Sequence, residues 1–303
     1  MTTPAADVTS LEEIRREIDA IDDGILDLLA RRIVASEQVR HHKNNTGALS
    51  ASPIRPAREA AILRRLVARG GAVVPPELLV RLWRAILSTS TLSQAPVTLH
   101  VTRKLGSSLG MRLKLKDHFC DMPVEEHRDE AQALIQVNVN AGDICVVDTH
   151  SQWAGPFAEG RAGDARIIGV LPVLREVPVP GLLIFGHAQA LATGDDETIL
   201  VSDGRLPRDF LPSPAWQVKS GLRHVSGIPG YLSEHEGPLA GLMRSNAALG
   251  LLVAGRYPAP KKIQKMTTHQ KGVEGAWVPL PMQPYEKALM DRLFTRADAI
   301  IFR

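Results

Sequence analysis

The chain has 303 residues, 44% hydrophobic and 23% charged, so its length suggests about two domains and its composition is that of a folded globular protein. A formal net charge of +3 is too small to indicate a nucleic acid or a membrane surface as the partner. No apolar run reaches the ~18–20 residues of a membrane span, and the first residues lack the apolar segment of a signal peptide. Two cysteines cannot form a disulfide scaffold. We therefore expect a cytoplasmic protein with reduced thiols.

Residues 10–95 are predicted to form three helices. The first begins at a capping box, in which Ser10 and Glu13 satisfy early backbone N–H groups. Its apolar residues then recur every three or four positions. The expected bounds are Ser10 to about Asn45, Pro53 or Pro56 to Gly70, and Pro76 to about Gln94. A helix of ~35 residues is about 50 Å long. Dimerisation is the natural way to bury a helix of that length.

Polar residues interrupt the apolar faces of all three helices. Arg32 and Lys43 share one face of the first helix, because eleven residues make about three turns. The others are Arg58 and Glu59 on the second helix, and Ser90 and Gln94 on the third. A single Arg or Lys on such a stripe usually extends to water. Buried charges are costly unless paired, so their coincidence on three helices indicates a positive pocket for a small anion. Twelve of the thirteen cationic residues up to Gln94 are arginine, which binds carboxylates bidentately.

Residues 10–95 resemble the all-helical (type II) chorismate mutase family. The matching motifs are Leu11-Glu-Glu-Ile-Arg15-Arg-Glu-Ile18-Asp19-Ala-Ile-Asp22, Leu29-Ala-Arg-Arg32, Lys43, the Arg58-Glu59 pair and Ser90-x-x-x-Gln94. Each motif is short, but they follow one another in order at compatible spacing. The resemblance implies a three-helix fold that forms an intertwined dimer with two shared sites. It also implies the rearrangement of chorismate to prephenate, which is unimolecular and needs no metal or cofactor.

The same resemblance implies a role for each site residue. Lys43, Gln94 and Arg32 are the expected catalytic residues, and Arg15, Arg58, Glu59 and Ser90 are expected to bind substrate. Of these, the arginines would bind the carboxylates, Lys43 and Gln94 would donate to the ether oxygen, Glu59 would accept from the ring hydroxyl, and Ser90 would line the pocket. Arg55 stands where the family often has an acidic residue, three positions before the Arg-Glu pair.

Helix geometry adds a constraint on Arg15. It precedes Arg32 by 17 residues, which is ~25 Å along a helix, so the two side chains cannot hold one small molecule from the same helix. We therefore expect a homodimer in which Arg15 reaches the site of the second copy.

Residues 96–303 are predicted to form a second, α/β domain behind the helical domain of residues 1–95, because strands and helices alternate. The expected strands are Val97–Val101, Asp143–Asp148, Arg166–Leu171, Gly181–Gly186, Thr198–Val201 and Leu249–Ala254. The expected helices lie at residues 107–118, within residues 125–140, at Pro238–Asn246 and near Pro284–Arg296. A turn is expected at Gly227–Gly230, and a solvated lysine-rich loop at Lys261, Lys262, Lys265 and Lys271.

The order of elements in residues 97–203 resembles a divergent prephenate dehydratase domain with a periplasmic-binding-protein-like fold. Gly142–Asp148 is similar to the strand that leads into that family's Glu-Asn-Ser segment, but Thr149-His-Ser-Gln follows here. At Asp196-Glu-Thr198 the arginine and phenylalanine of its Thr-Arg-Phe motif are absent. We therefore expect a regulatory or partner-binding domain rather than a competent dehydratase. The alternatives are a bifunctional mutase–dehydratase, a related enzyme that releases pyruvate from isochorismate, and a non-catalytic chorismate or phenylalanine sensor.

Overall fold

The computed structural model describes residues 10–46, 52–70 and 73–262. The chain divides into two compact units, Met1–Ile263 and Gln264–Arg303, and every described residue lies in the first. The expected helix near Pro284–Arg296 and two of the loop lysines, Lys265 and Lys271, fall outside the described residues.

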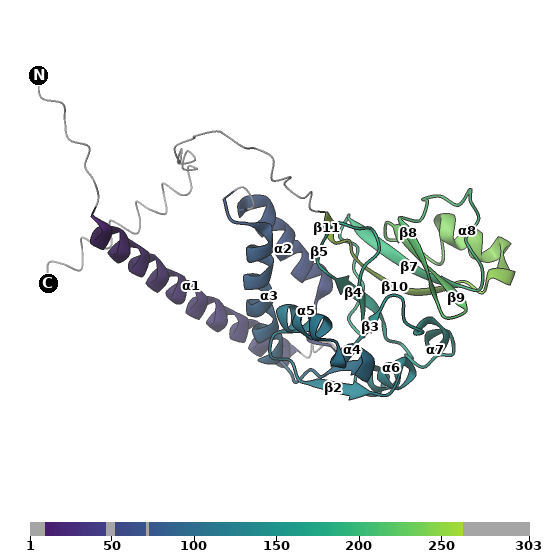
Figure 1. Cartoon of the computed structure of the whole chain (residues 1–303), viewed down its shortest axis with the longest axis horizontal. Coiled ribbons are helices and arrows are strands. Elements are labelled where there is room, and N and C mark those ends of the chain that lie inside the picture. The colour runs from purple at the N-terminus through teal and green to yellow at the C-terminus, as the bar shows by residue number, and fades with distance from the viewer. Residues whose placement is uncertain (1–9, 47–51, 71–72, 263–303) are drawn as a thin grey trace, which may run out of the picture. The chain divides into compact units, whose positions relative to one another are not determined.

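The helical elements follow the order labelled in Figure 1. They are α1 (Leu11–Thr46), α2 (Pro56–Gly70), α3 (Pro76–Leu92), α4 (Arg103–Ser107), α5 (Leu109–Phe119), α6 (Glu130–Val139), α7 (Ala154–Ala158), α8 (Gly237–Ser245) and the 3-10 turn η1 (Ala247–Leu249). The predicted capping box is confirmed, because the Glu13 carboxylate accepts from the backbone N–H of Ser10 and the Ser10 hydroxyl accepts from that of Glu13. Proline occupies the start of α3, where its missing N–H costs nothing.

The apolar stripe of α1 is exposed in this single chain. Its members are Leu11, Ile14, Ile18, Ile21, Ile25 and Leu28, each between 42% and 62% exposed. The expectation that dimerisation buries this helix stays a prediction. The other two helices, α2 and α3, pack against each other and against the α/β part, with α3 beside α5 and α2 beside β10 (Leu252–Pro258).

On α3 the buried side chains are Leu79, Arg84, Leu87, Ser88 and Thr91, whereas Leu82 is 49% exposed. The buried side of α3 is set by its neighbours α2 and α5, which the sequence of the helix alone does not reveal.

The strands form one mixed sheet and a small pair. They are β1 (Leu99–Thr102), β2 (Val124–His127), β3 (Ile144–Asp148), β4 (Arg166–Leu171), β5 (Leu174–Arg175), β6 (Leu182–Gly186), β7 (Asp196–Ser202), β8 (Trp216–Ser220), β9 (Arg223–Pro229), β10 (Leu252–Pro258) and β11 (Lys261–Lys262). The nine-stranded sheet has the order β2-β1-β3-β6-β4-β10-β7-β9-β8, and β11 pairs with β5. The expected organisation, a helical part followed by an α/β part, is confirmed.

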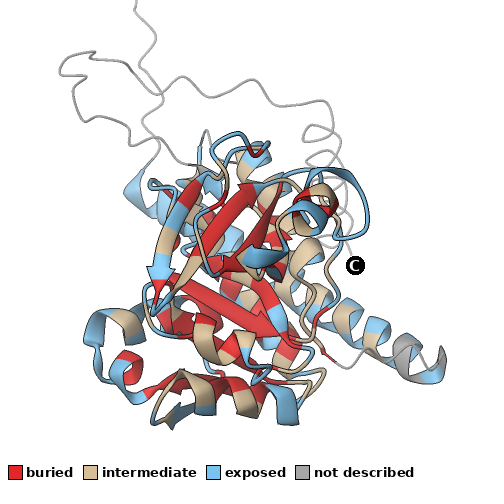
Figure 2. Cartoon of the chain, turned by 90° about the vertical axis from the view of Figure 1, so that its right-hand side faces the viewer, coloured by how far each residue is buried: buried red, intermediate tan, exposed pale blue. Residues whose placement is uncertain are grey.

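The core strands are apolar along their length because both faces of the sheet are covered. Alternate residues of β3 enter different clusters: Ile144 and Val146 pack with side chains from α5, whereas Cys145 and Val147 pack with side chains from α6 and α7. In Figure 2 the central strands are coloured as buried throughout much of their length.

One local expectation needs correction. Gly227-Ile-Pro229 lies within β9, paired with β7, rather than in a turn. The error comes from strand pairing between residues distant in sequence. The helix expected within residues 125–140 is confirmed as α6, and β2 precedes it. Among the described helices, none combines the length and the apolar character needed to cross a membrane.

Candidate active site

The junction of α1 and α3 brings together three of the predicted site residues. Arg32 Nη1 donates a hydrogen bond to the Ser90 hydroxyl at 2.9 Å. The same hydroxyl donates to the Ile86 carbonyl at 2.8 Å, which fixes its orientation on α3. Gln94 Nε2 donates to the Ser90 carbonyl at 2.9 Å. Arg32 is half-buried here, and this burial lowers the pKa of its guanidinium.

A second arginine of α1 reaches the same end of α3. Arg40 Nη1 donates to the Ser93 carbonyl at 3.0 Å, one residue before Gln94. The sequence analysis did not single out Arg40. Its spacing of eight residues from Arg32 is the signal, because that spacing places it close to the same side of the helix about two turns on. The junction therefore combines two cationic side chains with the Ser90 hydroxyl and the Gln94 amide.

The other predicted site residues lie elsewhere or are only partly described. Lys43 lies near the end of α1, and its side chain is outside the described residues. Arg15 is exposed and pairs with Glu12 at 2.7 Å on the same helix. Arg58 is exposed on α2. The single chain thus brings Arg32, Ser90 and Gln94 together, whereas its described contacts do not bring Arg15, Arg58 or Glu59 to them.

Glu59 takes part in a buried ion pair. Its Oε2 accepts a hydrogen bond from Arg84 Nη1 of α3, with side-chain exposures of 15% and 9%. Arg84 Nε also donates to the His118 carbonyl at 3.3 Å, and the Ser88 hydroxyl donates to that carbonyl at 3.2 Å. Burial, together with the Arg84 charge, lowers the pKa of His118 well below its usual value. The sequence analysis missed Arg84, because this residue lies on a different face of α3 from Ser90 and Gln94.

A cavity of about 110 Å³ adjoins this ion pair, between α2, α3 and the sheet. Its lining is mainly apolar, with side chains such as Leu63, Phe119 and Ile168, and also includes Glu59, Arg64, Arg84, His118 and Lys261. Arg84 is bound to Glu59, and Arg64 to the Asp195 and Ala259 carbonyls. A dianion needs several converging donors, so this lining does not match the expected anion pocket. The α1–α3 junction, with the guanidinium groups of Arg32 and Arg40, matches it better.

In the α/β part the residues noted from sequence have structural partners. Asp148 accepts a hydrogen bond from the His150 backbone N–H at 2.8 Å, which caps the end of β3. Glu197 forms a buried ion pair with Arg175 at 2.7 Å and also accepts from the indole N–H of Trp216. These two contacts hold Glu197 within the core. The pKa of Tyr257 is raised well above its usual value, mainly by burial and also by the negative charge of Glu197.

Comparison with known proteins gives four findings. In solved structures the chain is similar to a protein titled "GqqA- a novel type of quorum quenching acylases", with 12% identity over 54% of this chain and 95% of that one, and a TM-score of 0.35. It is also similar to prephenate dehydratase from Streptococcus mutans, with 9% identity over 55% of this chain and 99% of that one, and a TM-score of 0.33. No curated protein matches the chain. Residues 14–95, which span most of α1 and all of α2 and α3, match the model of the family chorismate mutase type II.

Proposed function

We propose that the protein is a chorismate mutase that rearranges chorismate to prephenate. The match of residues 14–95 to the type II family carries this proposal. The contact between Arg32 and Ser90, with Gln94 one turn beyond, supports it because these residues come from two separate helices and meet at one place. Arg40 adds a second guanidinium there.

The rearrangement of chorismate places two requirements on such a site. The flexible substrate dianion must be held in a compact conformer, and guanidinium groups such as those of Arg32 and Arg58 can hold its carboxylates. The breaking C–O bond also places negative charge on the ether oxygen. Donors already oriented toward that oxygen stabilise the transition state more than the ground state. We assign these donors to Lys43, which supplies a full charge, and Gln94, which supplies a neutral N–H.

The described contacts place Glu59 with Arg84, on the side of α3 that faces α2, whereas Arg32 meets Ser90 on another side. We keep Glu59 as a substrate-binding residue on the family resemblance, because it can accept from substrate while it still binds Arg84. A carboxylate offers two acceptor oxygens, and Arg84 binds Oε2. In our proposal Oε1 accepts from the ring hydroxyl of the substrate, while Arg84 fixes the orientation of the side chain. Arg84 is then a positioning residue.

The proposed working unit is a homodimer. The exposed apolar stripe of α1 supplies a surface that a second copy of the same helix can cover. Arg15 lies ~25 Å along α1 from Arg32, so it would serve the partner's site rather than its own. Its present pairing with Glu12 is exposed, and exposed ion pairs contribute little, so Arg15 can exchange Glu12 for a substrate carboxylate. Residues 96–303 would then be an accessory part, regulatory or partner-binding.

The test measures consumption of chorismate by the full-length protein, with the product identified by chromatography. Arg32→Ala is compared with Arg31→Ala, because Arg31 is the exposed neighbour on the same helix. Prephenate formation that falls with Arg32→Ala and persists with Arg31→Ala supports the proposal. A folded protein that binds chorismate without turnover would replace it with the sensor function. Phenylpyruvate as product would add a dehydratase step, and pyruvate released from isochorismate would indicate the lyase instead.

A further inference from the structure

Two histidines and a glutamate converge at the edge of the sheet, away from the proposed mutase site. His100 lies on β1 and pairs in register with Glu125 of the parallel edge strand β2. His127 follows Glu125 by two residues, so both side chains project from the same face of β2. The neighbours of His100, Leu99 and Val101, pack into the core on the opposite face. The pairing of β1 with β2 therefore gathers three side chains that can bind a metal at one place.

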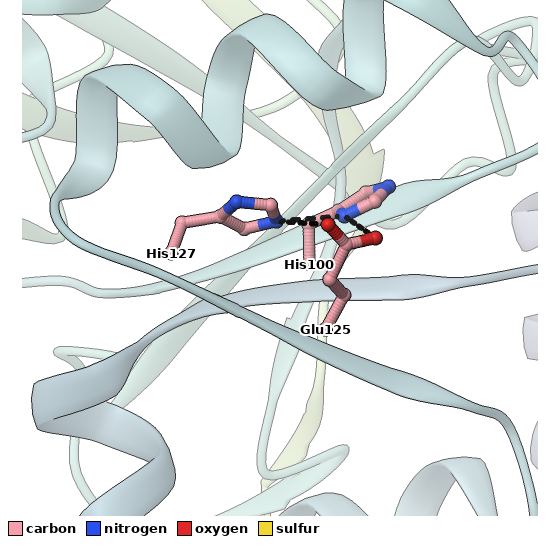
Figure 3. Close-up of side chains that lie close together, drawn as sticks. All are labelled: His100, Glu125 and His127. Carbon is pink, nitrogen blue, oxygen red and sulfur yellow. Dashed lines mark hydrogen bonds and ion pairs between the residues drawn. The ribbon is translucent and has the colours of Figure 1, made fainter.

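The ligand atoms of these three residues face one another, as Figure 3 shows. His100 Nδ1 lies 2.9 Å from His127 Nε2. The Glu125 carboxylate oxygens lie 3.8 Å from His100 Nδ1 and 3.9 Å from His127 Nε2. All three ligand atoms lie within 4.8 Å of one another.

The other ring nitrogen of His100 is held by a buried carboxylate. His100 Nε2 lies 3.2 Å from Asp143 Oδ2, and both side chains are more than nine-tenths buried. Asp143 is itself fixed, because it accepts from the Thr98 backbone N–H at 2.7 Å and from the Asn140 amide at 2.8 Å. A carboxylate at Nε2 keeps the proton on that nitrogen and leaves the Nδ1 lone pair directed at the cluster. Carboxylates hold metal-binding histidines in this way in many proteins.

We propose that His100, His127 and Glu125 bind a Zn²⁺ ion, with Asp143 orienting His100. Zinc bonds to nitrogen are about 2.0–2.1 Å long, so two histidine nitrogens bound to one ion lie ~2.9 Å apart at a right angle and ~3.3 Å apart at the tetrahedral angle. The observed 2.9 Å agrees with this range. The Glu125 oxygens, at 3.8 and 3.9 Å from the two nitrogens, need to move by about 0.5–1 Å to come within this range, which is a small change for an exposed side chain.

The site is anchored on one side and open on the other. His100 is 4% exposed and Glu125 is 59% exposed in their side chains. Three protein ligands leave the fourth zinc position for a water molecule or a small anion, as in open zinc sites. The ion would also fasten the edge strand β2 to β1. Without the ion, the N–H of His127 Nε2 donates a hydrogen bond to His100 Nδ1. Zinc binding at His127 Nε2 requires the other neutral tautomer of that imidazole, with its proton on Nδ1.

Zinc titration of the metal-free full-length protein by competition with a chromophoric chelator tests the proposal. Glu125→Gln is the main variant, because its side chain is exposed and the change keeps its shape. Glu126→Gln is its matched control, since Glu126 lies next in the same strand beside Gly106 on the other face. His127→Asn is paired with His150→Asn, an exposed histidine at the end of β3. Circular dichroism checks that each variant is folded.

We expect one zinc ion per chain, whose affinity falls at least tenfold in Glu125→Gln and His127→Asn and is unchanged in both controls. Asp143→Asn should weaken it by about 10–100-fold, the usual effect of losing such an orienting partner. X-ray absorption of the zinc-bound protein should show nitrogen and oxygen neighbours that include two imidazoles. The proposal is wrong if the protein does not bind zinc stoichiometrically, or if binding is unchanged in both Glu125→Gln and His127→Asn. In either case His100 and His127 are a hydrogen-bonded pair and not a metal site. Because the readout is zinc binding, this result is independent of chorismate turnover.

Discussion

Replacement of Glu59 by alanine tests the buried ion pair that joins α2 to α3. The variant leaves the Arg84 guanidinium without its carboxylate in a site where its side chain is 9% exposed. Removing one partner of a buried pair costs about 3–5 kcal/mol, much of it because the remaining charge is uncompensated. For 150–250 residues, each kcal/mol lowers the melting temperature by roughly 2–4 °C, so we expect a fall of about 6–20 °C.

The double variant Glu59→Leu with Arg84→Met separates charge from packing. It removes both charges together, so its free energy of unfolding should fall less than that of Glu59→Ala. The His118 carbonyl keeps the Ser88 hydroxyl as a donor after Arg84 is lost. Glu77→Ala is the control, because Glu77 also lies in the first turn of a helix but is exposed.

Thermal and urea unfolding, followed by circular dichroism, measure these proteins together with the single variants Glu59→Leu and Arg84→Met. If Glu59→Ala melts within about 2 °C of the parent, the ion pair contributes little and the reasoning fails. A double variant as unstable as the sum of its single variants would also contradict the coupling. Chorismate turnover measured well below each melting temperature then reports separately on any contact of Glu59 with substrate.

Four further predictions address the site and the stability. Lys43→Ala should lower kcat/KM by more than about 10²–10³, because a charged donor is lost; activity within tenfold of the parent would remove Lys43 from the mechanism. The rate of the parent should be constant between about pH 5 and 8, since the Gln94 amide stays a donor throughout; a sharp acid optimum would contradict this. The pKa of His118 is lower in the folded protein than its ordinary 6.5. Below pH 6.5 the unfolded chain therefore binds more protons, and the free energy of unfolding decreases as the pH is lowered, by up to ~1.4 kcal/mol per pH unit. His127 and His224 shift in the same direction, so the test is whether His118→Phe flattens the dependence of melting temperature on pH while His150→Phe does not. Gly255→Ala should destabilise by about 1–3 kcal/mol, because its new methyl would overlap the Ile167 backbone, whereas Gly241→Ala in α8 has open space; equal melting temperatures would refute this.

The local pattern of the sequence determined most of the elements. The capping box at Ser10 and the prolines at the helix starts predicted where the three N-terminal helices begin. The strand Arg166–Leu171 is predicted with its observed bounds, because it is an apolar run buried on both faces. Periodicity also placed Arg32, Ser90 and Gln94 on facing stripes, and the structure brings them together. These features depend on neighbours within a few residues, which the sequence displays directly.

Tertiary structure decided the contacts between elements that lie far apart in the chain. The partner of Glu59 is Arg84, 25 positions on, because α3 turns one side toward α2 and the sheet and another toward α1. The cluster of His100, Glu125 and His127 exists only through the parallel register of β1 with β2, so neither segment alone indicates a zinc site. The sequence could predict which faces are apolar or polar. Which face meets which follows from packing the whole chain, because burial is decided by area shared between distant segments.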